Sequence, residues 1–153
     1  MVGDLPDCDN SLNTQKGRFF EDLAARVLAE HYGVRFETNA AIEIGDPPKL
    51  HKFDLRSVDG AYVGECKNYS WTKSGNVPSA KMGFCNQAVF YLSKLPGGSA
   101  RFLCMRLDKR PNNGERLADY YYRTYGHLLD DVFVVEIDTT TGEVREIGQN
   151  AEG

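Results

Sequence analysis

Two acidic residues flank a turn signal in the middle of the chain. Asp59-Gly60 is a strong hairpin signal, and it separates two half-apolar runs that alternate as strands do. If these two residues form the loop, counting outward along both strands puts Asp54 directly opposite Glu65. Cross-strand neighbours have Cβ atoms about 4.5–5.5 Å apart, where two like charges destabilise a sheet. The pair therefore requires a compensating cation, and a hard divalent ion such as Mg²⁺ takes carboxylate oxygens.

A lysine follows this acidic pair at a spacing that matters for chemistry. Because side chains alternate along a strand, Glu65 and Lys67 share the face that carries Asp54, while Cys66 points the other way. An ammonium group would then stand beside the metal, where it can orient a water or stabilise developing negative charge. The spacing thus predicts a metal centre with an adjacent lysine.

Asp54, ten intervening residues and then Glu65-Cys66-Lys67 resembles the PD-(D/E)XK nuclease superfamily, which has the restriction-endonuclease-like fold. Phe53 stands where the motif's name has proline, a position that varies in the family. The resemblance implies a Mg²⁺-dependent nuclease, with Mn²⁺ able to substitute, in which Asp54 and Glu65 hold the metal. The backbone carbonyl of Cys66 would be a further ligand, and Lys67 would lie near the attacking water. A lone Glu-x-Lys is common by chance, so the flanking helices matter.

A helix is expected over residues 14–33, ahead of the hairpin. Glu21 lies at the margin of its apolar stripe, and resemblance to the archaeal junction resolvases of the superfamily implies that it binds a second metal or its water shell. The alternative is a solvated glutamate favoured by the helix dipole. The stripe consists of Phe20, Leu23, Ala24, Val27 and Leu28.

A second helix is expected over residues 78–94, after the hairpin. Gln87 and Tyr91 are similar to the glutamine-to-tyrosine motif of the RecB-like branch, which implies that both border the active site and contact nucleic acid. The alternative is an ordinary polar residue and a tyrosine with an exposed hydroxyl. The apolar face of this helix is expected to be Met82, Cys85, Val89 and Leu92.

The pattern of the whole chain predicts an α/β fold with a restriction-endonuclease-like αβββαβ core, a central mixed sheet flanked by helices. We expect one domain over 1–153, with a core at about 14–107, a C-terminal helix and strand extension at about 108–147, and polar, disordered ends at 1–13 and 148–153. The expected strands are 34–44, 49–58, 61–67, 100–107, 131–138 and 143–147, with a third helix over 115–129.

Charge is distributed unevenly along the chain. The net charge is −4, which excludes a generally basic nucleic-acid binder, yet residues 49–110 hold eleven Lys and Arg against four Asp and Glu. Local positive potential is what attracts a phosphate backbone. Phosphate contacts are therefore expected from Lys52, Lys73 and Lys81, and stacking on unpaired bases from Trp71 and Tyr69.

The sequence thus predicts a deoxyribonuclease, with single-strand or structure specificity left open. The alternatives are an inactive nucleic-acid-binding or assembly module on the same fold, and an RNA-cleaving member such as a toxin. No apolar run reaches the ~18 residues of a membrane span, so we expect a cytoplasmic protein without membrane contact. His51 is expected at the surface, with contact to a phosphate as the alternative. Tyr120-Tyr121-Tyr122 is a candidate homodimer contact.

Overall fold

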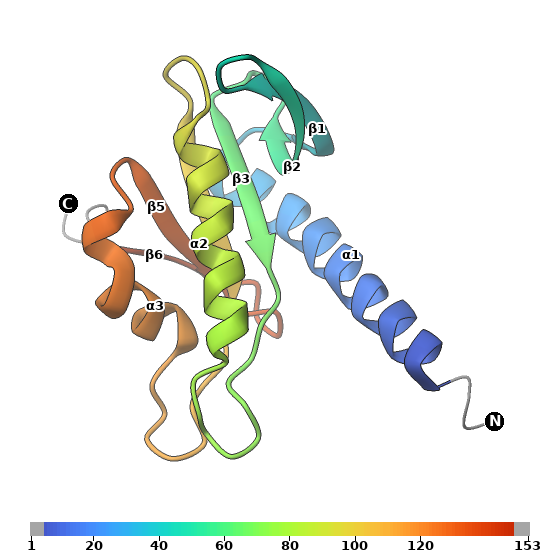
Figure 1. Ribbon diagram of the computed structural model, residues 1–153, viewed down its shortest axis with the longest axis vertical. Coiled ribbons are helices and arrows are strands. Elements are labelled where there is room, and N and C mark those ends of the chain that lie inside the picture. Colours follow the sequence, from blue (N-terminus) through green and yellow to red (C-terminus); the bar gives the residue numbers. More distant parts are fainter. Residues whose placement is uncertain (1–4, 149–153) are drawn as a thin grey trace.

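The computed structural model describes residues 5–148, with side chains from residue 14 onward, as an α/β fold built on one open sheet (Figure 1). Six strands lie side by side in chain order within these residues. β3, β4 and β5 are parallel, and the other neighbouring pairs are antiparallel, so the expected mixed sheet is confirmed. The strands are β1 (Phe36–Ile44), β2 (Lys49–Ser57), β3 (Tyr62–Lys67), β4 (Ala100–Arg106), β5 (Val132–Ile137) and β6 (Val144–Ile147).

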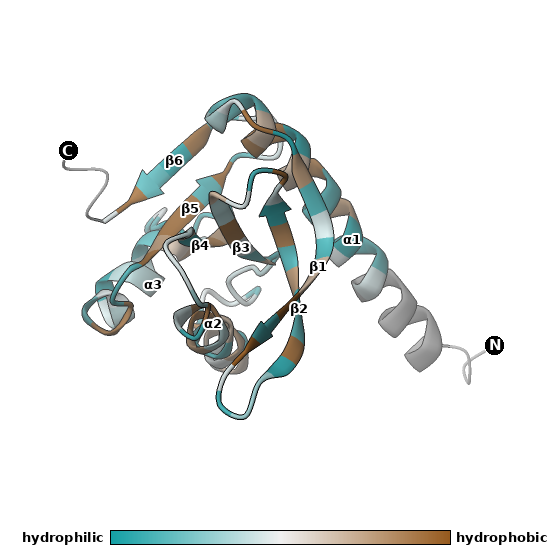
Figure 2. Ribbon diagram, turned by 90° about the horizontal axis from the view of Figure 1, so that it is seen from above, coloured by the Kyte–Doolittle hydropathy of each residue, from teal (hydrophilic) through white to brown (hydrophobic). Residues whose placement is uncertain are grey.

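Helices cover both faces of the sheet. The described residues form α1 (Leu5–Tyr32), α2 (Ser79–Ser93) and α3 (Leu117–Tyr125), and a 3-10 turn over Gly126–Leu128 continues the last. α2 and α3 each join two parallel strands, and crossovers of the usual right hand put both helices on one face. α1 lies on the opposite face, as the view from above makes clear (Figure 2).

The helix bounds differ from expectation at two places. α1 begins at Leu5, so residues 5–13 of the polar N-terminal end are helical, while 1–4 and 149–153 lie outside the described residues. α3 ends at Tyr125 because the chain tightens there into the 3-10 turn rather than continuing to residue 129.

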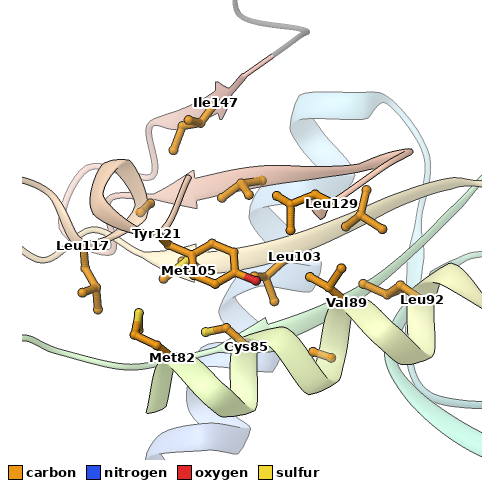
Figure 3. Close-up of a cluster of buried hydrophobic side chains, with 14 of the residues drawn as sticks. Met82, Cys85, Val89, Leu92, Leu103, Met105, Leu117, Tyr121, Leu129 and Ile147 are labelled. Carbon is orange, nitrogen blue, oxygen red and sulfur yellow. The ribbon is translucent and has the colours of Figure 1, made fainter. Parts of the chain in front are cut away.

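Two hydrophobic clusters hold the helices to the sheet. The apolar face expected for α2 is confirmed, since all four of its residues are buried together with residues of β4 and α3 (Figure 3). On the other face, Phe20, Ala24 and Leu28 of α1 pack against β3, β4 and β5. Burying each large apolar side chain contributes roughly 1.5–3 kcal/mol, so both faces anchor the strands that carry the acidic residues.

The tyrosine triplet on α3 is not a continuous surface patch. Tyr121 is fully buried, and its hydroxyl donates a hydrogen bond to Asn86 Oδ1 at 2.8 Å. Tyr120 and Tyr122 are partly buried against the same cluster. Tyr121 is therefore not available to contact a second copy of the chain, because helical spacing turns it toward the sheet.

The loop between β2 and β3 is longer than expected but preserves the expected register. Residues 58–61 form the loop, because the Ser57 hydroxyl accepts a hydrogen bond from the Tyr62 N–H at 2.9 Å and donates one to Asp59 at 2.7 Å. Gly60 has a φ of 74°, which favours glycine. Leu55 still pairs with Gly64, so Asp54 and Glu65 follow as the next opposed positions.

Candidate functional site

The two opposed carboxylates lie where β2 separates from β3. The strands are paired at Leu55 with Gly64 and at Arg56 with Val63. At the next position the Cys66 N–H donates a 2.8 Å hydrogen bond to Asp54 Oδ2, so a carboxylate takes the place of a backbone partner. Asp54 is partly buried, and Glu65 is only 6% exposed. The expected juxtaposition of these two acids is therefore present.

A bend in the β1–β2 hairpin explains the separation. Residues two apart on a regular strand face the same side, yet Phe53 packs with the α2 cluster and Leu55 with the α1 cluster. On β1, Asn39 sits between the partners of these two residues and has a φ of 55°, a conformation that asparagine tolerates better than most residues. The far half of the hairpin consequently turns toward α2.

Burial and mutual repulsion dominate the electrostatics of the acidic group. Burial first, then the charge of Asp54 and a hydrogen bond with it, raises the pKa of Glu65 from 4.5 to about 9. Burial, then Asp54 and Asp22, raises the pKa of Glu21 to about 7. Lys67 lowers the pKa of both glutamates but does not offset these causes. The structure thus brings Glu21, Asp54, Glu65 and Lys67 into one electrostatic neighbourhood.

The two residues after Glu65 point in different directions. Cys66 pairs with Cys104 on β4, and its thiol is buried in the α1 cluster, as alternation predicts. The Lys67 ammonium lies 6.0 Å from the centre of the Tyr69 ring. Burial raises the pKa of the Tyr69 hydroxyl, and the positive charge of Lys67 opposes that rise. Lys67 and Tyr69 are therefore close enough to act on each other.

His51 joins the site, although no sequence signal placed it there. Its Nε2 lies 3.1 Å from Glu65 Oε1, and its ring is stacked on Tyr91 of α2 with centroids 3.9 Å apart. His51 keeps part of its surface exposed, but the bend at Asp54 carries its ring against α2. Tyr91 thus reaches the acidic pair through His51, whereas Gln87 is exposed on α2.

A cationic cleft of about 800 Å³ opens beside Lys67. Its cationic wall residues are Lys16, Lys67, Lys81 and Arg106, and none of the acidic side chains that the structure describes lines it. The remaining wall residues are Gly17, Cys66, Asn68, Tyr69, Ser70, Thr72 and Pro78. Arg106 Nη1 lies 3.6 Å from Asp108 Oδ1, so its charge is partly neutralised. Arg106 Nε also donates a hydrogen bond to Asn68 Oδ1. The cleft therefore offers mainly lysine ammonium groups to an anion.

The basic and aromatic residues expected at the substrate divide into two groups. Lys81 lies in the cleft, with its ammonium 5.2 Å from the Tyr69 ring centre. Lys52 and Lys73 are exposed outside its wall. Tyr69, expected to stack on bases, belongs to the wall, and so do Lys16 and Arg106, which the sequence did not indicate.

Trp71 packs into the protein rather than facing the cleft. It is 6% exposed, its indole N–H donates to the Asp108 carbonyl at 3.2 Å, and Arg110 covers its ring at 4.4 Å. The Asp108 loop holds the Trp71 ring in the core, so the ring is not exposed for the expected stacking on bases. Tyr69 is the aromatic side chain that the cleft presents.

Among the side chains of residues 14–148, no group of three or more His, Cys, Asp and Glu could hold a metal ion. None of the helices in this part of the chain combines the length and apolarity of a membrane span.

Comparison with protein families, curated proteins and solved structures finds no match. Fold and site together therefore define an α/β protein with a buried acidic pair, a neighbouring lysine and a cationic cleft.

Proposed function

We propose that this protein is a divalent-metal-dependent nuclease that hydrolyses phosphodiester bonds, with DNA favoured over RNA as its substrate. The observation that carries the proposal is the opposed pair of Asp54 and buried Glu65, whose repulsion Lys67 only partly offsets, beside a cleft lined mainly by lysines. Perturbed carboxylates in a cleft are typical of functional sites.

The donor set fits magnesium. Mg²⁺ prefers oxygen ligands, keeps several of its waters, and usually binds through one or two carboxylates plus substrate phosphate. Asp54 and Glu65 would hold the ion, the Cys66 carbonyl would be a further ligand, and Glu21 would hold a second ion or its water shell. A pair of carboxylates is therefore enough for a magnesium site. Bound there, the metal would polarise the phosphate and lower the pKa of a water.

The remaining roles belong to the side chains around this pair. Lys67, whose ammonium lies near the Tyr69 ring, would position the attacking water or stabilise negative charge on the phosphorane-like transition state. Lys16, Lys81 and Arg106 would bind the phosphate backbone along the cleft. Tyr91 would support the site through His51.

The test is cleavage of labelled single-stranded, duplex and branched DNA, and of RNA, with Mg²⁺ or with a chelator. We expect metal-dependent cleavage of DNA that falls at least about 100-fold in Asp54→Asn and in Lys67→Ala. Lys94→Ala, which removes an exposed lysine outside the cleft, is the matched control and should cleave normally. Cleavage that survives both site substitutions contradicts the mechanism.

The substrate arms of the same experiment separate the remaining alternatives. Cleavage of RNA alone would move the protein to the ribonucleases and leave the acidic site intact as an explanation. Binding of DNA without cleavage of any substrate would favour an inactive binding module on this fold.

A further inference from the structure

His51 is fixed in orientation by three contacts, one each from α2, β2 and β3. Its ring lies parallel to Tyr91 of α2, with centroids 3.9 Å apart and an interplanar angle of 14°. Phe53, on the same strand, meets its edge at 4.6 Å and 73°. The third contact is the 3.1 Å approach of Nε2 to Glu65 Oε1. Two aromatic rings thus hold the imidazole so that one nitrogen faces the buried carboxylate.

The Glu65 carboxylate is consequently constrained from two sides. Asp54 is the residue opposed to it across the β2–β3 pair, and His51 Nε2 lies 3.1 Å from its Oε1. A side chain held in this way cannot rotate freely about its terminal bond. The orientation of a metal ligand is commonly set by such a hydrogen-bonding neighbour, and removal of the neighbour typically lowers metal affinity 10- to 100-fold.

We infer that His51 is a positioning residue that orients Glu65 for a divalent cation, with Tyr91 holding the imidazole in place. This inference rests on the proposed function of the Asp54–Glu65 pair. It gives Tyr91 a role that differs from contact with nucleic acid, because the tyrosine ring supports the histidine from behind. His51 touches neither substrate nor metal in this arrangement and acts through Glu65.

The experiment measures Mn²⁺ affinity by calorimetry, together with the melting temperature in chelator, for the full chain and two variants. His51→Phe keeps a ring against Tyr91 and Phe53 but lacks the nitrogen. His51→Gln replaces the ring with an amide that can still hydrogen-bond Glu65. His127→Phe, on an exposed histidine after α3, is the matched control for surface histidine binding of Mn²⁺.

We expect His51→Phe to weaken Mn²⁺ binding about 10- to 100-fold without lowering the metal-free melting temperature. His51→Gln should recover part of the affinity, and His127→Phe should bind as the wild type does. Wild-type affinity in His51→Phe overturns the inference, and so does an equal loss in both His51 variants that parallels a lower melting temperature. Absence of Mn²⁺ binding by the wild type instead contradicts the proposed function itself, so the two failures are distinguishable.

Discussion

Glu65 and Glu136 are both buried carboxylates, but the charged groups next to them have opposite signs. Glu136 of β5 is 2% exposed, and Arg116 Nη1 and Arg145 Nε lie 2.9 and 3.0 Å from its Oε1. Glu65 of β3 is 6% exposed and faces the carboxylate of Asp54. Burial is common to both residues, so the sign of the neighbouring charge is what separates a structural carboxylate from a functional candidate.

The difference has a consequence for stability. Removal of one partner of a buried ion pair strongly destabilises the folded protein, because the other charge is left uncompensated. Without a metal ion, Glu65 avoids an uncompensated charge by keeping a proton that the unfolded chain releases at neutral pH, so the metal-free site opposes folding there. Functional sites commonly lower stability in this way.

The largest expected contrast is in activity. Glu65→Gln should lower Mg²⁺-dependent cleavage more than about 100-fold, because a neutral amide replaces a ligand carboxylate. Glu136→Gln, assayed at a temperature where it is folded, should cleave within a few-fold of wild type. Gel assays with labelled DNA at saturating Mg²⁺ measure both rates, and equal losses in the two variants would remove the distinction.

The second contrast is in stability. Glu136→Gln should lose about 3–5 kcal/mol of unfolding free energy, because it leaves two guanidinium groups without their buried partner. Urea unfolding in chelator, followed by tryptophan fluorescence, measures the change. A neutral effect would mean that the arginines find solvent and that Glu136 is not the compensated case described here.

The third prediction concerns pH. The raised pKa of Glu65 means that, between about pH 4.5 and about pH 9, the folded protein keeps a proton that the unfolded chain has released. The folded state therefore binds more protons, and the contribution of this group to stability falls as pH rises through that window.

Glu65→Gln does not titrate and should escape this loss. In chelator, its unfolding free energy should exceed that of wild type by a margin that grows from about pH 5 to about pH 9, reaching about 1–3 kcal/mol at pH 7. Parallel urea titrations at several pH values measure the margin. A margin that stays constant with pH would show that Glu65 ionises normally in the folded protein.

The smallest expected effect comes from removing a single cation, either from the cleft or from beside Glu136. Lys81→Gln should weaken DNA binding a few-fold and reduce the salt dependence of affinity by about one charge, with little change in stability. Arg145→Gln, which removes a partner of Glu136, should lower stability and leave DNA affinity unchanged. Fluorescence anisotropy over a salt series and urea unfolding separate the two outcomes.

Local sequence signals predict much of this molecule. Asp59-Gly60 fixes which residues of β2 and β3 face each other, so Asp54 could be placed opposite Glu65 even though the loop is longer than two residues. Helical spacing likewise predicts the buried face of α2, since its period follows directly from backbone geometry.

Contacts between elements that are distant in the sequence could not be predicted from local sequence signals. His51 reaches Glu65 because β2 bends opposite Asn39, and the residues around His51 contain no signal that predicts this bend. Trp71 is held by Asp108, a residue that lies 37 positions further along the chain. Its place in a polar segment predicted exposure, whereas tertiary packing buries it.

The most direct measurement is the anomalous difference density of crystals soaked in Mn²⁺, with Asp54→Asn crystals as the control. The account predicts one strong peak within ligand distance of the Asp54 and Glu65 carboxylates, which is lost in the variant. Density at other surface acids with none between these two carboxylates would contradict it.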